Sequence, residues 1–136
     1  MPVSIDSPKY VYADILIALA QADGYIDPRE RKLLDGIFHE MELDEEKVEE
    51  MWLTPCTLDV VEAKLADIPD GTFKNCLVKD AYLVAFADTK VVNEESTFIR
   101  TLCTAMNVSN DRRDAIKAWV ETALTQKETA EILFGA

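Results

Sequence analysis

The sequence predicts an all-α single domain of about seven to eight helices. Apolar residues recur at intervals of three and four, and helix-capping signals stand before most of the apolar stretches. Only four glycines and five prolines occur in 136 residues, and no convincing alternation of apolar and polar residues indicates a β-strand. Since this length suffices for one sizeable core and not for two ordinary ones, we expect one domain over residues 1–136.

The first half of the chain predicts two long helices joined by a short junction. Ser7-Pro8 indicates an N-cap and a first helical residue, and the helix from about residue 8 to residue 22 is apolar on most faces, which is typical of a central helix. Asp27-Pro28-Arg29-Glu30 is a capping box that opens the second helix. The apolar stripe of this second helix consists of Leu33, Leu34, Ile37, Phe38 and Met41.

Shorter elements are expected between the halves. Asp44 is the expected N-cap of a short acidic helix that carries Trp52, and a further short helix is expected from about residue 57 to residue 66. The composition of residues 67–71 predicts a turn. We expect both tryptophans, Trp52 and Trp119, in the core, with an anchoring role in a protein contact as the alternative.

The second half predicts four more helices. Thr72 opens a second apolar helix, and Asn93 and Ser109 are the expected N-caps of the next two. Thr125-Gln-Lys-Glu128 is a capping-box pattern, so we expect a separate last helix that leads to residues 132–134. The apolar residues of these helices include Leu77, Ala81, Leu83, Val84 and Phe86, then Phe98, Ile99, Leu102 and Met106, and then Ile116 and Val120.

The two halves match when the chain is shifted by 65 residues, the spacing from Asp23 to Asp88. Ala20-x-Ala22-Asp23-x-x-Ile26-x-x-x-Glu30 then aligns with Ala85-x-Ala87-Asp88-x-x-Val91-x-x-x-Glu95. Shared apolar positions arise readily between any two amphipathic helices, whereas matched acids at a helix junction do not. We therefore expect two helical hairpins, in repeat halves of about 8–53 and 72–120, that pack around a pseudo-two-fold axis and form one core.

The first junction, residues 23–30, matches only the second half of an EF-hand calcium loop. An acid, a glycine, an aliphatic residue and a glutamate follow at the right spacing, but Leu19 and Gln21 stand where acidic ligands belong. Because calcium takes six to eight oxygens, a standard EF-hand is excluded.

The sequence is compatible with a cation site that is shared between the two junctions. In a pseudo-two-fold arrangement Asp23, Glu30, Asp88 and Glu95 would converge into a carboxylate cluster suited to a hard divalent cation. The alternative is structural, with Glu30 acting in its capping box and Asp23 bonding the amides of the junction. A divalent cation is thus the one cofactor that the sequence suggests.

Acidic residues outnumber basic residues and concentrate in the first half. The net charge is −12; residues 1–68 hold 16 acids and 6 bases, and residues 69–136 hold 10 and 8. Such a surface repels phosphate backbones, so we do not expect a nucleic acid partner. A basic protein partner fits the densest run, residues 39–50, and an ordinary solvated helix face is the alternative. The candidate contact residues are Glu42, Glu45, Glu46 and Glu49.

Neither a catalytic motif nor a targeting segment is apparent. The single histidine, His39, has no plausible nucleophile beside it, and no phosphate-binding glycine loop occurs, so we expect no enzyme. The longest apolar runs fall far below the roughly 18 residues of a membrane span, and the N-terminus lacks the pattern of a signal peptide. We therefore expect a cytoplasmic protein with no membrane insertion, with Cys76 and Cys103 as reduced core residues.

Residues 16–30 resemble the signature of TerB-like tellurite-resistance proteins, an apolar helix ending in Ala-Asp-Gly, followed by an aliphatic residue and a helix-opening glutamate. Residues 87–95 look like the repeated form, with Thr89 in place of Gly24, and the resemblance extends from about residue 8 to residue 120. It implies a repeated all-α fold, a cytoplasmic, non-enzymatic role in tellurite or chemical-stress responses, and metal binding by the four junction acids. Of the two functions, the acidic run favours an interaction module, with divalent-metal binding as the alternative.

Overall fold

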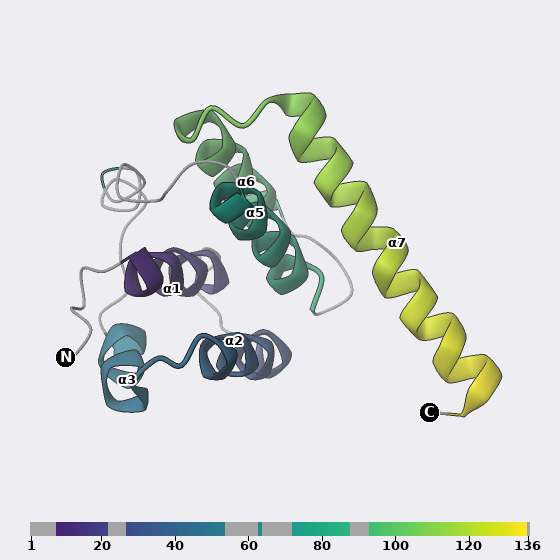
Figure 1. The fold of residues 1–136 in the computed structure, drawn as a ribbon, viewed down its shortest axis with the longest axis horizontal. Coiled ribbons are helices and arrows are strands. Elements are labelled where there is room, and N and C mark those ends of the chain that lie inside the picture. The colour runs from purple at the N-terminus through teal and green to yellow at the C-terminus, as the bar shows by residue number, and fades with distance from the viewer. Residues whose placement is uncertain (1–7, 22–26, 54–62, 64–71, 88–92, 136) are drawn as a thin grey trace.

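The computed structural model describes residues 8–21, 27–53, 63, 72–87 and 93–135. These residues form helices and no strand, so the predicted all-α fold is confirmed (Figure 1). The short helix and the turn expected between residues 57 and 71 lie outside the described residues, apart from residue 63. The six helices that are described are α1 (Pro8–Ala20), α2 (Pro28–Glu40), α3 (Glu45–Leu53), α5 (Thr72–Ala85), α6 (Asn93–Ala105) and α7 (Asn110–Phe134).

Helix α1 forms the centre of the core because it is apolar on nearly every face. All side chains from residue 10 to residue 20 are buried, and Asp14 is the one carboxylate among them. The helix contacts α2, α3, α5 and α6, and Figure 1 shows it between the α2–α3 pair and α5. The predicted central helix is therefore confirmed, although it ends at Ala20, slightly before the expected end.

Helices α2, α5 and α6 each bury one face against α1 or against one another. Leu34 and Phe38 of α2 are buried, and the other residues of its predicted stripe are half-buried against the core. Cys103 of α6 is buried as expected, and burial raises the pKa of its thiol to about 11. Cys76 of α5 is only half-buried. The remaining buried residues of α5 and α6 are Leu77, Val78, Ala81, Tyr82, Val84, Ala85, Phe98, Ile99, Leu102 and Met106, together with Glu95.

The sequence repeat is visible in the helix boundaries. Helices α2 and α6 begin at residues 28 and 93 and end at residues 40 and 105, a shift of 65 at both ends. The helices that follow them begin at residues 45 and 110, which is the same shift. As predicted, each of these starts with a side-chain cap, where Asp44 Oδ1 accepts from Glu46 N at 3.0 Å and Ser109 Oγ accepts from Arg112 N at 3.1 Å.

The turns that end α2 and α6 are also the same. Both are Schellman turns, with a residue of positive φ just after the helix: Glu42 at 60° and Asn107 at 59°. A lysine from the preceding long helix holds each turn, since Lys9 Nζ and Lys74 Nζ each donate to the carbonyl 32 residues on at 3.2 Å. The Schellman bonds run from Leu43 N to Phe38 O and from Val108 N to Cys103 O, and from Glu42 N to His39 O and from Asn107 N to Thr104 O.

Helix α7 is one continuous helix of 25 residues, so the prediction of a separate last helix is wrong. A helix N-cap must leave the helical conformation, and residues 121–125 contain neither a proline nor a glycine to break the helix. The hydroxyl of Thr125 instead donates to the carbonyl of Glu121, one turn earlier, at 2.9 Å. A capping-box sequence inside a strong helix therefore does not start a new one.

The prediction of a core position is confirmed for Trp52 and wrong for Trp119. Trp52 is 6% exposed, whereas Trp119 is 61% exposed. Helix α7 packs on α5 through the face that carries Val120, and successive residues of a helix are turned by about 100°. Trp119 therefore lies beside that contact rather than within it. Of the helices described, none has the length and apolar character that crossing a membrane requires.

Candidate acidic docking site

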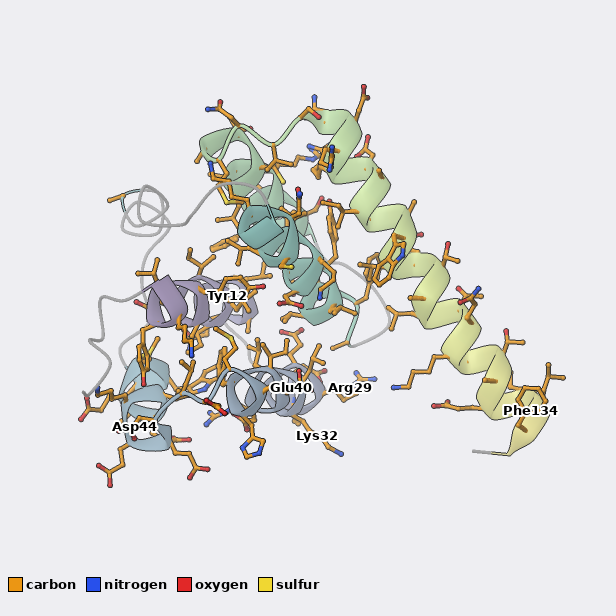
Figure 2. All side chains as sticks on the ribbon, in the orientation of Figure 1. Tyr12, Arg29, Lys32, Glu40, Asp44 and Phe134 are labelled. Carbon is orange, nitrogen blue, oxygen red and sulfur yellow. The ribbon has the colours of Figure 1, made fainter. Side chains whose placement is uncertain are left out.

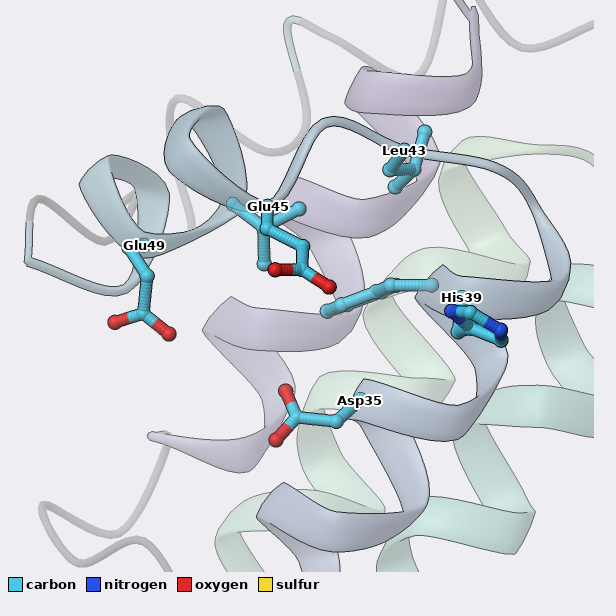
Figure 3. Close-up of a pocket in the computed structure, with 7 residues that line it drawn as sticks. Asp35, His39, Leu43, Glu45 and Glu49 are labelled. Carbon is cyan, nitrogen blue, oxygen red and sulfur yellow. The ribbon is translucent and has the colours of Figure 1, made fainter.

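A hollow between α2 and α3 gathers acidic side chains around an apolar floor. Its volume is about 280 Å³. Figure 3 shows Asp35 and His39 on the α2 side and Glu45 and Glu49 on the α3 side. We call it the acidic hollow; the residues that line it are Asp35, Phe38, His39, Leu43, Glu45, Val48 and Glu49.

The short connection between α2 and α3 places these groups together. The Schellman turn reverses the chain after Met41, and the Asp44 cap starts α3 at Glu45, so the last turns of α2 lie beside the first turns of α3. Helix α1 holds the connection in place. Tyr10 Oη accepts a hydrogen bond from Asp44 N at 3.0 Å, and Lys9 Nζ donates to Met41 O.

The floor of the hollow is apolar and its rim is charged. Phe38, Leu43 and Val48 are each at least nine-tenths buried and belong to the hydrophobic core. The rim residues are exposed, and they stand four positions apart on each helix, so each pair shares one helix face. A ligand in the hollow would therefore meet hydrocarbon below and carboxylates at the edge.

Arg31 links the two sides of the rim. Its guanidinium lies 2.6 Å from Glu49 Oε1 and 3.3 Å from Asp35 Oδ1, and it stacks 4.2 Å from the centroid of the Trp52 ring. Within the described residues Glu45 has no ion pair. With three carboxylates and one guanidinium, the hollow keeps a local charge of about −2 when His39 is neutral.

The four glutamates predicted to bind a partner divide into two groups. All four are exposed, but only Glu45 and Glu49 line the acidic hollow, whereas Glu42 and Glu46 lie outside it. The sequence pattern does not identify Asp35 as a binding residue, and it gives His39 no role. The one signal in the sequence is the four-residue spacing of these two residues, which puts them on one helix face. That signal is weak, because their approach to α3 depends on the turn between the helices.

The second half carries different residues on the same backbone. A shift of 65 replaces Asp35 by Arg100, His39 by Thr104 and Glu45 by Asn110. It also replaces Val48 of the floor by Arg113, while Glu49 becomes Asp114 and stays acidic. Because α2 and α6 share their boundaries and their turns, the fold itself does not require the carboxylates of the acidic hollow.

The junction acids predicted to bind a metal are described only in part. Glu30 and Glu95 lie in the first turns of α2 and α6 and are 4% and 3% exposed, and both interact with other groups of the chain. Asp23 and Asp88 lie outside the described residues, so the convergence of the four acids stays a prediction. Within the described ranges no three His, Cys, Asp or Glu side chains form a group that could hold a metal ion.

No protein-family model, curated protein sequence or solved structure matches this chain. The resemblance to TerB-like proteins therefore rests on the junction motifs.

Proposed function

We propose that this protein is a non-enzymatic, cytoplasmic interaction module that binds a basic segment of a protein partner through the acidic hollow. One observation carries the proposal: exposed carboxylates surround a buried apolar floor. Lysine and arginine side chains have the matching parts, an apolar stem and a cationic head. At about 280 Å³ the hollow lies just below the roughly 300–1,000 Å³ of small-molecule sites, so it suits a single side chain better than a cofactor.

Electrostatics supports the same partner. The hollow lies in the half of the chain with 16 acids and 6 bases, so a basic segment is attracted before contact is made. Arg31 already lies between Asp35 and Glu49, and a second cation would pair with Glu45. Since the rim is exposed, we expect modest affinity that falls as the salt concentration rises.

Titration with a defined peptide tests the proposal. The probe is a short arginine- and lysine-rich peptide, with a glutamate-rich peptide of equal length as the negative control. Glu45→Gln/Glu49→Gln should weaken binding about fivefold, because each exposed ion pair contributes about 0.2–1 kcal/mol. Glu42→Gln/Glu46→Gln makes the same change of charge outside the hollow and should weaken binding less than twofold. Equal losses in the two variants would mean that the hollow is not the docking site.

The sequence resemblance supplies the biological setting. We place this module in a tellurite or wider chemical-stress response, with the two hairpins around an approximate two-fold axis as in a repeated TerB-like fold. The matched boundaries of α2 and α6 support the repeat. Deleting the gene should lower growth in tellurite, and a copy carrying the Glu45→Gln/Glu49→Gln change should fail to restore it. Growth that is unaffected by the deletion would remove this setting and leave the binding proposal to the peptide titration.

Divalent-metal binding at the junctions is the second candidate function. It is favoured by the burial of Glu30 and Glu95 at equivalent positions of the two halves. Thermal unfolding of metal-stripped protein with calcium, magnesium, manganese or zinc is the test. An ion that binds only the folded state raises its stability by about 2.7 kcal/mol at a hundredfold excess over the dissociation constant. The rise should disappear when Asp23, Glu30, Asp88 and Glu95 are changed to amides, and no rise up to millimolar ion would exclude the site.

A further inference from the structure

The distal part of α7 exposes large apolar side chains. Ile132, Leu133 and Phe134 are 82%, 67% and 78% exposed. Figure 1 shows this part of the helix running away from α5, and Figure 2 shows Phe134 at its far end, well separated from Arg29 on α2. Since successive residues of a helix are turned by about 100°, these three side chains expose apolar surface on more than one side of the last turn of α7.

A groove of about 680 Å³ separates this part of α7 from α2 and α5. Leu33, Leu83, Phe86 and Leu124 give it apolar walls. Its rim carries charges of both signs, with Arg29 and Lys127 against Glu121, Glu128 and Glu131. A partner of one charge sign would meet a like charge on this rim, whereas a surface of mixed sign would not.

One stripe of α7 continues past the end of its contact with α5. Val120 is fully buried, and Leu124 packs against the core half-buried. Lys127, Glu131 and Phe134 follow at intervals of three, four and three residues from Leu124, so all four lie on one helix face. These three residues are exposed. The stripe therefore reads apolar, basic, acidic, apolar along the helix.

We infer that this stripe binds a second copy of the chain, with the two α7 ends antiparallel about a two-fold axis at the level of residue 129. In that register Leu124 faces Phe134 of the second copy, because both lie five residues from the axis. Lys127 likewise faces Glu131 of the second copy, two residues from the axis. The order of the stripe is thus self-complementary, and a two-fold axis forms each contact twice.

In this dimer the groove of each copy covers the apolar side chains that the contact between the two α7 helices leaves exposed. The apolar last turn of one copy, residues 132–134, lies against the groove wall that Leu83 and Phe86 of the other copy form. The rim cations Arg29 and Lys127 then face a helix end that is acidic through Glu131 and through the negative end of its dipole. A basic peptide lacks this match, and the acidic hollow on α2 and α3 is the site that suits it.

Charge reversal across the proposed axis is the decisive experiment. Molar mass is measured by sedimentation equilibrium at protein concentrations from about 1 µM to 1 mM. This range covers the dissociation constants of weak dimers. Wild-type protein should pass from monomer to dimer in this range. Lys127→Glu places glutamate opposite Glu131, and Glu131→Lys places lysine opposite Lys127, so each should raise the dissociation constant at least tenfold. Lys127→Glu/Glu131→Lys should restore it.

Mixing the two single variants separates the dimer contact from effects inside one helix. An equimolar mixture of Lys127→Glu and Glu131→Lys proteins places opposite charges at both contacts, so it should form a heterodimer that neither variant forms alone. Phe134→Glu should abolish dimerisation while circular dichroism shows unchanged helix content. Wild-type protein that stays monomeric to 1 mM, a dimer unaffected by the single variants, or a mixture without heterodimer would each overturn the inference.

Discussion

Helices α2 and α6 begin, end and turn in the same way, yet the surfaces beside their C-terminal turns carry different charges. Asp35 and Glu45 border the turn after α2, whereas Arg100 and Asn110 occupy the equivalent positions after α6. The backbone and the core therefore fix the turn, and exposed side chains are free to differ. The difference between the halves identifies the acidic hollow as a feature that folding does not require.

The helices that follow the two turns differ as well. Helices α3 and α7 start at equivalent residues, Glu45 and Asn110. Helix α3 ends at Leu53, whereas α7 continues to Phe134. The extra turns of α7 first pack on α5 and then extend beyond it. The first half thus carries a charged hollow, and the second half carries a long helix with an exposed apolar end.

The largest expected effect tests whether the two halves share one core. Leu34 and Ile99 are equivalent, and they are 0% and 1% exposed. Leu34→Ala and Ile99→Ala should each lower the free energy of unfolding by about 2–5 kcal/mol, because each leaves a cavity among packed side chains. Urea denaturation should show a single transition in both variants. A cost below about 1 kcal/mol at one position, or two separate transitions, would mean that the halves are not one cooperative unit.

A smaller effect is expected at the two residues of positive φ. Asparagine tolerates the left-handed conformation better than glutamate, so Glu42→Asn should stabilise the protein by about 0.5–1 kcal/mol and Asn107→Glu should destabilise it similarly. Glu42→Gln removes the same charge without relieving the backbone and should change the stability little. Chemical denaturation measures all three. A loss of stability in Glu42→Asn would show that the two turns are not equivalent.

The smallest effect concerns the cap of α2. Asp27 Oδ1 accepts hydrogen bonds from the backbone N and from Nε of Arg29, and these bonds lower the pKa of its carboxyl. A lowered folded-state pKa adds stability above the unfolded value of about 3.9, and this stability is lost as the pH falls through the folded value. Asp27→Asn should therefore have a lower melting temperature at pH 7 and a difference from wild type that shrinks below pH 4. A constant difference between pH 7 and pH 2 would contradict this role.

Local patterns predicted most of the fold. Side-chain caps at Asp27, Asp44 and Ser109 and the apolar faces of α1, α2 and α6 all follow from residues close in sequence. Each of these features depends on one helix and its first turn, so it can be recognised without tertiary structure.

The sequence did not predict the full length of α7 or the features that depend on contacts between helices. Thr125 matches a capping box but lies inside α7, because no residue near it stops the helix. Trp119 has the size of a core residue, but the contact of α7 with α5 leaves it exposed. Asp35 joins the acidic hollow only through the packing of α3 beside α2. Even there, the glutamate-rich run pointed to Glu45 and Glu49 and could not separate them from Glu42 and Glu46.

Giving the acidic hollow the residues of the second half tests the central claim most directly. Asp35→Arg/Glu45→Asn gives the hollow the residues of the second half, and Glu42→Asn/Glu46→Arg changes the net charge by the same amount outside it. Binding of the arginine- and lysine-rich peptide is followed by isothermal titration calorimetry at fixed salt. We expect the first variant to lose binding at least tenfold and the second to stay within about threefold of wild type, since surface charges away from the contact act through screened solvent. Equal losses in the two variants, or full binding by the first, would contradict the account.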